Sequence, residues 1–458
     1  MSHRNFRSAT VVSGLFVAAT LLAACGSGTP GAAAGESSDT TGGTGGADVV
    51  TVEMWQDQFA EADNAWYAEQ VKAFNAAHDD VQIKLVVVPG DAWEQKMKAA
   101  QAAGTTPDMY TLNYSEVQPK ARGGELAPLT ELISADAWAD VDQRFLDAVT
   151  VDSYQYAYPL LFEPSSLFFY RTDLFQEAGL DPDSPPTTWD ELIDATKALK
   201  AASPDVVPFQ TAQNAVELSW TTWGLQHGLA GHFPISDDWS TSLITDPAYR
   251  PLFETYQRLM QEGALAKQPL SAYGDATPLG EGKLAMMVSG SWAISLLVKD
   301  YPDMIPNLAV APMPAFDGDQ TKPTGTLGGW TIGVDAKSEH QKEAAEAISW
   351  LLAEDVDVPL DYFVKTDFTK FSPRASVMEA IVEADTGVNP WLNVMVEEIA
   401  PYQVLEATYD WSVSLAIGTA LEKVMQGGDV TAAIEEADAT ITKSIADLDL
   451  PSQLTKRS

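Results

Sequence analysis

Residues 282–292 have the sequence GKLAMMVSGSW. The centre of this segment is a short apolar run, which is typical of a buried strand, and the run ends in Ser-Gly-Ser before Trp292. In open α/β sheets, ligands bind just outside the carboxyl ends of the strands, and this is where the segment places Trp292. A large aromatic side chain is also an ordinary core residue, so the segment alone leaves both interpretations open.

The first part of the chain predicts a parallel sheet. Apolar runs alternate with helical stripes, which indicates strands at 49–55, 81–89 and 107–112 and helices at 61–77 and 91–103. Strand, helix and strand in this order are typical of βαβ units with right-handed crossovers. The predicted fold class is therefore α/β.

The remainder of the chain continues this mixture. Residues 158–170 (YPLLFEPSSLFFY) form a long apolar run around Glu163, whose carboxylate is costly to bury without a partner. Further strands are expected at 206–210, 308–312 and 325–334, and further helices at 188–200, 220–227, 249–263, 341–352, 411–425 and 430–448. No segment of this part has 18 consecutive apolar residues, so the sequence predicts no second membrane segment.

Composition limits the possible partners. The 458 residues include 65 acidic and 27 basic side chains, and the formal net charge is −38. This charge argues against binding to nucleic acid or to anionic lipid, whereas a cationic solute such as a polyamine remains possible. The single cysteine, Cys25, excludes an internal disulfide, and the five histidines show no strong metal-ligand spacing. We expect neither a metal nor a cofactor.

The N-terminal residues predict export and membrane attachment. Residues 1–24 resemble a signal peptide, with Arg4 and Arg7 before an apolar run. The run ends at 22–25 in LAAC, which resembles the lipobox of bacterial lipoproteins and implies cleavage before Cys25 and lipid attachment to its thiol. Residues 25–47 are rich in Gly, Ser, Thr and Ala and predict a flexible tether. The expected location is the extracellular face of the cell membrane, with a lipid anchor at Cys25.

A series of short motifs follows along the chain. They are LAAC at 22–25, VEMW at 52–55, PD at 107–108, YPL at 158–160 followed by Glu163, FYRTDLF at 169–175, TWDEL at 188–192, GKLAM at 282–286, GSW at 290–292, PMP at 312–314, GGW at 328–330, AEAI at 345–348, WLL at 350–352 and SPR at 372–374. Taken together and in this order, these motifs resemble the family 1 extracellular solute-binding proteins of ABC importers, which include the maltose-binding protein and its relatives for other sugars.

The resemblance implies a periplasmic-binding-protein-like fold of two discontinuous α/β lobes, with a hinge and a ligand cleft between them. It places residues 48–160 and 306–355 in the N-terminal lobe, and residues 161–305 and 356–450 in the C-terminal lobe. It also implies a monomer that captures a carbohydrate, closes around it and docks on the membrane permease subunits of an ABC importer.

The resemblance also indicates which residues bind the ligand. A sugar needs flat aromatic side chains for its apolar faces and planar polar groups for its hydroxyls. Trp292 and Trp411 match stacking positions of the family, and Trp330 follows two glycines that let the backbone approach a ligand. With the polar residues near strand ends and crossovers, the candidates are Gln56, Asp57, Asn113, Tyr114, Glu163, Trp220, Trp223, Trp292, Gly329, Trp330, Arg374 and Trp411.

Other interpretations of these residues remain open. Trp220 and Trp223 have helical spacing and fit a core position equally well, and Arg374 is able to pair with Glu163 or to form a different ion pair. A membrane-anchored glycoside hydrolase would need two carboxylates across a bond, such as Asp57 and Glu163. No P-loop, G-x-S-x-G or H-E-x-x-H motif occurs. The sequence therefore predicts carbohydrate binding without catalysis, ahead of a cation-binding protein, a hydrolase or a scaffold without a ligand.

Overall fold

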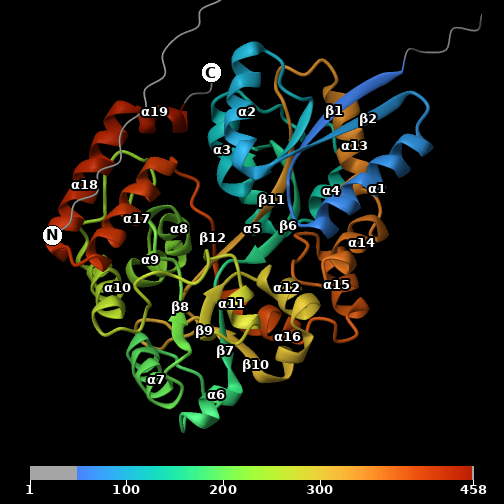
Figure 1. Ribbon diagram of the computed structural model, residues 1–458. Coiled ribbons are helices and arrows are strands. Elements are labelled where there is room, and N and C mark those ends of the chain that lie inside the picture. The colour runs from blue at the N-terminus through green and yellow to red at the C-terminus, as the bar shows by residue number, and fades with distance from the viewer. Residues whose placement is uncertain (1–48, 456–458) are drawn as a thin grey trace, which may run out of the picture. The chain divides into compact units, whose positions relative to one another are not determined.

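Residues 49–455 are described by a computed structural model, in which helices surround two main β-sheets (Figure 1). The predicted signal peptide, Cys25 and the tether all lie outside the described residues. Within 49–455, no helix combines the length and the apolar character needed to cross a bilayer.

The first sheet begins with the predicted βαβ units. β1 (Val50–Asp57) pairs in parallel with β2 (Val81–Val88) and with β3 (Met109–Asn113). The connecting helices are α1 (Glu61–Ala77) and α2 (Gly90–Ala103). The apolar stripe of α1 is buried because its members recur at intervals of three or four residues. The α/β fold class is thus confirmed in this part of the chain.

The same sheet contains antiparallel pairs that the βαβ pattern did not predict. β11 (Thr326–Val334) runs antiparallel both to β3 and to β6 (Ala157–Pro164). The two-residue strand β12 (Val404–Leu405) pairs in parallel with the beginning of β11. β11 is therefore the strand on which segments from distant parts of the sequence meet.

The second sheet contains the segment GKLAMMVSGSW. Its strand order is β10 (Leu308–Pro312), β7 (Leu167–Arg171), β9 (Leu284–Ser289) and β8 (Val207–Gln210). The expected strand in residues 282–292 is confirmed as β9, which pairs with β7 on one side and β8 on the other.

Both faces of this second sheet are buried. In β7, Leu167 and Phe169 belong to the larger of two hydrophobic cores, whereas Phe168 and Tyr170 belong to the smaller core. A strand with two buried faces needs apolar side chains at successive positions. This requirement explains why β7 lacks the alternation of a strand with one solvated face.

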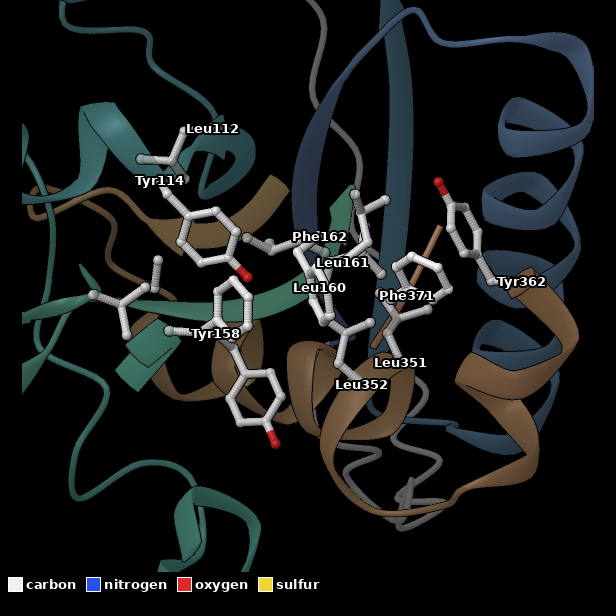
Figure 2. Packing of buried hydrophobic residues seen from close by; sticks show 14 of the residues in the cluster. Leu112, Tyr114, Tyr158, Leu160, Leu161, Phe162, Leu351, Leu352, Tyr362 and Phe371 are labelled. Carbon is white, nitrogen blue, oxygen red and sulfur yellow. The ribbon is translucent and has the colours of Figure 1, made fainter. Parts of the chain in front are cut away.

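The larger core also holds side chains from late helices. α14 (Asp357–Lys365) and α15 (Ala375–Ala384) pack there together with α12 (Ala293–Asp300). Figure 2 shows another part of this core, with Tyr158 and Phe162 of β6, Phe371, and Tyr362 of α14. The smaller core is formed with α7 (Trp189–Ala202), α10 (Arg250–Gln261), α17 (Trp411–Met425) and α18 (Val430–Asp447).

The chain passes from the first sheet to the second between β6 and β7, and it returns between β10 and β11. β10 lies in the second sheet, so the residues after 306 rejoin the first sheet only at β11. α14, which lies after residue 356, packs against α1. The exact division into lobes stays a prediction.

One helix prediction is wrong in detail. The helix expected at 220–227 is two helices, α8 (Ala215–Thr221) and α9 (Trp223–Ala230), which are separated at Thr222. The hydroxyl of Thr222 donates to the carbonyl of Leu218 at 2.7 Å, and this kind of side-chain bond to the preceding turn bends helices.

The other elements are short or lie at the edges of the fold. The helices are α3 (Tyr114–Arg122), α4 (Ala135–Ala139), α5 (Gln143–Ala148), α6 (Thr172–Glu177), α11 (Thr277–Gly280), α13 (Gln341–Ile348), α16 (Leu392–Val394) and α19 (Leu450–Thr455), and the strands β4 (Thr150–Val151) and β5 (Tyr154–Gln155) form a hairpin. Short 3₁₀-helices occur at Pro247–Tyr249, Pro302–Asn307 and Ala400–Tyr402, and π-helical turns at Ser349–Ala353 and Met395–Ile399.

Candidate functional site

A cavity of about 890 Å³ brings most of the predicted ligand-binding residues together. It is lined by the ends of β3 and β6 with α3, by the segment after β9, and by part of β11. Residues of α8 and α9, residues around β12 and the beginning of α17 complete the wall. Of the twelve candidates, those in the cavity wall are Asn113, Glu163, Trp220, Trp223, Trp292, Gly329, Trp330 and Trp411. Their role in binding remains a prediction, but the fold gathers them at one place.

Trp292 lies just beyond the carboxyl end of β9, as its sequence position indicates. The turn is fixed because the backbone N–H of Ser291 donates to the carbonyl of Pro164, at 3.0 Å, where β6 gives way to β7. The indole folds back over Gly290, where a Cβ would lie 2.0 Å from the ring. Trp292 is half-buried and lines the cavity. It therefore combines contacts to both cores with access to the cavity.

Trp330 is presented by the glycines at the beginning of β11. A Cβ at Gly329 would lie 2.2 Å from the carbonyl oxygen of Leu161, so only glycine allows β11 and β6 to approach so closely there. The pairing of these strands shifts register between Trp330 and Thr331. The half-buried indole of Trp330 meets the ring of Phe59 edge-on, with centroids 4.6 Å apart.

The other three tryptophans of the cavity come from α8, α9 and α17. Trp220 lies 6.2 Å from Trp292 between ring centroids. Trp223 is only 5% exposed, and its indole N–H donates to the hydroxyl of Ser414 at 2.9 Å, so most of this side chain serves packing. Trp411 is 44% exposed and stands perpendicular to Trp223, with centroids 6.3 Å apart. Trp411 therefore offers more accessible ring surface than Trp223.

Two carboxyl groups also line the cavity, and only one of them was predicted. Glu163 on β6 pairs with Gly328 on β11, and Glu406 directly follows β12, which pairs with β11 one residue earlier. Glu406 Oε1 lies 2.6 Å from the position that a Cβ on Gly328 would occupy. The missing side chain at Gly328 thus leaves room for Glu406 on the face of the sheet that Glu163 shares.

The surroundings of these two carboxyl groups disfavour their negative charge. Burial raises the pKa of Glu163 to about 7, although the positive charge of Lys370 acts in the opposite direction. Burial raises the pKa of Glu406 to about 8, and the charges of Glu163 and Glu116 add to this effect. In both side chains the Oε2 atom is shielded from solvent and has no hydrogen-bond partner among the described residues.

Four predicted residues do not line the cavity. Gln56 is fully buried and donates to Asn64 Oδ1 at 2.7 Å, and Tyr114 is 1% exposed and packs against Phe145. Asp57 stands at the end of β1, where burial raises its pKa. Their predicted contacts with a ligand therefore have no support from the cavity geometry.

Arg374, the fourth of these residues, serves the structure. Its Nε donates to Asp140 at 2.8 Å and its Nη1 donates to the carbonyl of Leu352 at 2.6 Å. The alternative pairing with Glu163 is not formed. At 6% exposure, Arg374 joins the end of α4 to the π-helical turn at Ser349–Ala353.

Several cavity residues escaped the sequence analysis, and among them are Ser115, Ser165, Glu406, Tyr409 and Asp410. Glu406 follows a strand of only two residues, which is too short to show a hydrophobic period. Asp410 does carry a recognisable signal, because it precedes the helix that Trp411 begins and caps it through the N–H of Ser412 at 2.9 Å. Within 49–455, no group of three or more His, Cys, Asp or Glu side chains is arranged for a metal ion.

Solved structures of other proteins share the fold of this chain. One is a cyclic α-maltosyl-1,6-maltose binding protein from Arthrobacter globiformis, which is 22% identical, covers 87% of this chain and 100% of its own, and has a TM-score of 0.71. Another is the sugar-binding protein MalE from Xanthomonas citri, with 22% identity, coverage of 87% and 98%, and a TM-score of 0.69. The periplasmic-binding-protein-like α/β fold is thus confirmed.

Comparison of sequences finds relatives that match about two thirds of this chain. The lactose-binding protein of Rhizobium radiobacter is 26% identical over 319 residues, which are 67% of this chain and 71% of the relative. The diacetylchitobiose binding protein DasA of Streptomyces coelicolor is 26% identical over 336 residues, which are 70% of this chain and 75% of the relative.

The family assignment comes from a comparison with whole protein families. Residues 56–358, more than half of the chain, match the bacterial extracellular solute-binding proteins. This match confirms the resemblance found in the sequence, and a family of binding proteins agrees with the prediction that the chain is not an enzyme. The chain belongs to the bacterial extracellular solute-binding protein family.

Proposed function

We propose that this protein captures a carbohydrate, either a monosaccharide or an oligosaccharide, and delivers it to the permease of an ABC importer. The observation that carries the proposal is the cavity wall, in which Trp220, Trp292, Trp330 and Trp411 stand beside polar groups. Sugar rings have apolar faces that pack on aromatic side chains, and their hydroxyls need hydrogen-bond partners such as Asn113 and Glu163.

The names of relatives support the same class of ligand. Lactose and diacetylchitobiose stand in the names of two relatives, and the two solved structures above are described as binding maltose-type or other sugars. The cavity is large for a single small metabolite, since ligand pockets usually measure about 300–1,000 Å³ and this one is near the upper end. We therefore favour an oligosaccharide.

Transport would couple ligand capture to a change of shape. The two sheets are joined by the crossovers between β6 and β7 and between β10 and β11, and Glu163 and Trp292 lie beside the first of these. In the proposed mechanism, the ligand bridges the predicted lobes, the hinge closes and the closed form docks on the permease as a monomer. Small-angle scattering with and without the ligand tests the closure, since the radius of gyration should fall on binding.

Membrane attachment is a separate part of the proposal. Cys25 would carry the lipid, and residues 26–47 would hold the folded part near the extracellular face of the membrane. Expression of the full chain with a labelled fatty acid tests this, because label should enter the wild type and not Cys25→Ala. Label in both proteins would contradict the lipobox assignment.

A thermal-shift screen of mono- and oligosaccharides tests carbohydrate binding. A sugar at one hundred times its dissociation constant should stabilise the folded protein by about 2.7 kcal/mol. Failure of every sugar to raise the melting temperature would contradict the proposal.

The matched variants Trp292→Ala and Trp350→Ala then locate the site. Both remove a half-buried indole, but Trp350 packs against Phe74 and His78 and is absent from the cavity wall. Both variants should melt earlier than the wild type, and only Trp292→Ala should bind the sugar more weakly. Equal affinity of Trp292→Ala and wild type would show that the cavity has been assigned wrongly.

A further inference from the structure

Glu163, Gly328 and Glu406 form one row across three neighbouring strands of the first sheet. Gly328 on β11 is directly opposite Glu163 on β6, and the pairing of Leu327 with Leu405 brings Glu406 next to Gly328 on the other side. Opposite residues on neighbouring strands direct their side chains to the same face. Because Gly328 has no side chain, the carboxyl group of Glu406 lies over it, on the face of the sheet that Glu163 shares. Figure 1 shows β6, β11 and β12 together near the centre of the fold.

The described residues place no cation in this row. Of the two cations of the cavity wall, Lys120 pairs with Glu116 and Glu125, and Arg122 donates to the carbonyl of Leu454 at 2.7 Å. Lys370, which acts on Glu163 from a distance, pairs directly with the buried Asp63. Among residues 49–455, Glu163 and Glu406 form no ion pair, and each has a buried oxygen that lacks a hydrogen-bond partner.

The indole rings of Trp292 and Trp330 also line this cavity. Trp292 is tied to the crossover next to Glu163 through the Ser291–Pro164 hydrogen bond, and Trp330 follows Gly328 by two residues on β11. Carboxylates together with indole faces bind ammonium groups, through charge-assisted hydrogen bonds and through cation–π attraction. A neutral sugar would supply hydroxyl donors but no positive charge, so the pair would compensate its charge only by binding protons, whereas an ammonium group would compensate it directly.

We propose that the transported carbohydrate carries a protonated amino group, and that Glu163 and Glu406 together bind this group at the cavity wall. The ligand class is thus an amino sugar, or an oligosaccharide that contains one. This inference rests on the proposed carbohydrate function, which it narrows. The overall charge of −38 would favour the approach of such a ligand at low salt.

Sugars that differ mainly at the amino position test how much the amino group contributes to binding. Calorimetric titration of the folded protein uses cellotriose, chitotriose with free amino groups, and its fully N-acetylated form, which share one linkage and length. Glucose with glucosamine, galactose with galactosamine and mannose with mannosamine extend the test to other stereochemistry. In at least one series the amine should bind about tenfold more tightly than its neutral partners, because a hydrogen bond to a charged group is stronger than one between neutral groups.

The variants Glu163→Gln and Glu406→Gln keep the shape of the side chains and remove the charge. Each should abolish the preference for the amine, so that the variant binds the amine and its neutral partner with affinities within about twofold of each other. Glu435→Gln, at an exposed position of α18, provides the control for a change of net charge and should preserve the preference.

The outcomes distinguish this inference from the function on which it rests. Neutral sugars that bind as tightly as their amines, or tighter, would overturn the inference and leave carbohydrate binding intact. An amine preference that survives both glutamine variants would also overturn it. Binding of spermidine without any sugar would contradict the carbohydrate function, and failure of every probe would contradict both.

Discussion

Two adjacent glycines of β11 have different roles, although the sequence GGW does not distinguish them. At Gly329, an added Cβ would meet the backbone of β6, with the carbonyl of Leu161 at 2.2 Å and the Cα of Phe162 at 2.8 Å. At Gly328 it would meet the end of the Glu406 side chain at 2.6 Å. Backbone in a sheet cannot move aside as a side chain can, so the two clashes have different consequences.

We therefore predict that Gly329→Ala loses about 2 kcal/mol or more of unfolding free energy, whereas Gly328→Ala loses less. Gly328→Ala should instead weaken ligand binding, because Glu406 must move into the cavity. Urea unfolding and calorimetric titration of both variants measure the two effects. Equal losses of stability, or unchanged binding by Gly328→Ala, would show that the close contacts do not govern these positions.

The raised pKa values of Glu163 and Glu406 predict how stability depends on pH. In an unfolded chain a glutamate titrates near pH 4.3, but in the folded protein burial raises the pKa values to about 7 and about 8. Between these limits the folded state binds more protons than the unfolded state. The contribution of the two groups to stability is therefore complete below about pH 4 and is lost as the pH rises through about 7 to 8.

Glu406→Gln should consequently be more stable than the wild type at pH 8 and close to it at pH 4.5. The charged groups that act on this position are Glu163 and Glu116, and both remain in the variant. Urea midpoints at the two pH values measure the difference, and Glu435→Gln, on the surface, should show no such dependence. A difference between Glu406→Gln and wild type that is the same at both pH values would contradict the assignment.

The caps of α7 and α17 allow the effect of a helix cap on stability to be separated from its effect on ligand binding. Thr188 and Glu191 form a reciprocal capping box at the beginning of α7, with the N–H of Glu191 donating to Thr188 Oγ1 at 3.2 Å. Asp410 caps α17 through Ser412, but it also lines the cavity beside Trp411. The two caps are thus matched in local chemistry and differ in their distance from the site.

Thr188→Ala and Asp410→Ala should each lose about 1 kcal/mol of unfolding free energy. Only Asp410→Ala should weaken sugar binding, because α17 begins with Trp411 and its first turn orients that ring. Denaturant midpoints and dissociation constants for one sugar measure both effects. An equal loss of affinity in Thr188→Ala would mean that a general loss of stability, and not the position of Trp411, controls binding.

Helices and strands with a strong hydrophobic periodicity were predictable from the sequence. Strands that exist only because they pair with distant residues were not. The buried stripe of α1 and the apolar run of β9 carry their structure in the local sequence. β12 has two residues and exists because it pairs with the beginning of β11, so no local sequence pattern predicts it. The same reason explains why Trp292 was found from its place after a strand, while Glu406 was missed.

For the molecule as a whole, the sequence predicted the order of the structural motifs along the chain, but not which distant segments contact one another. The resemblance placed lobe boundaries at 160–161 and 305–306, and the structure passes between its sheets after β6 and after β10. The membership of β10 in the second sheet, and the packing of α14 against α1, depend on contacts between distant residues. Such contacts are fixed by the complementarity of whole surfaces, which periodicity does not report.

The excess of acidic side chains has a consequence for the whole fold. A net charge of −38 concentrates like charges when the chain becomes compact, and this repulsion lowers the free energy of unfolding. Raising the salt concentration from 10 to 150 mM shortens the Debye length from about 30 Å to about 8 Å, so repulsion between charges farther apart than this is screened.

We therefore predict that the melting temperature at pH 7 rises by about 2 °C or more over this range of sodium chloride. At pH 4, where many carboxylates are protonated, the rise should shrink because less charge remains to be screened. Calorimetry at both pH values measures the effect, and choline chloride should act like sodium chloride if screening by ionic strength is the cause. A melting temperature that is flat or falls with salt at pH 7 would mean that local ion pairs, such as Lys370 with Asp63, outweigh the repulsion between the acidic side chains.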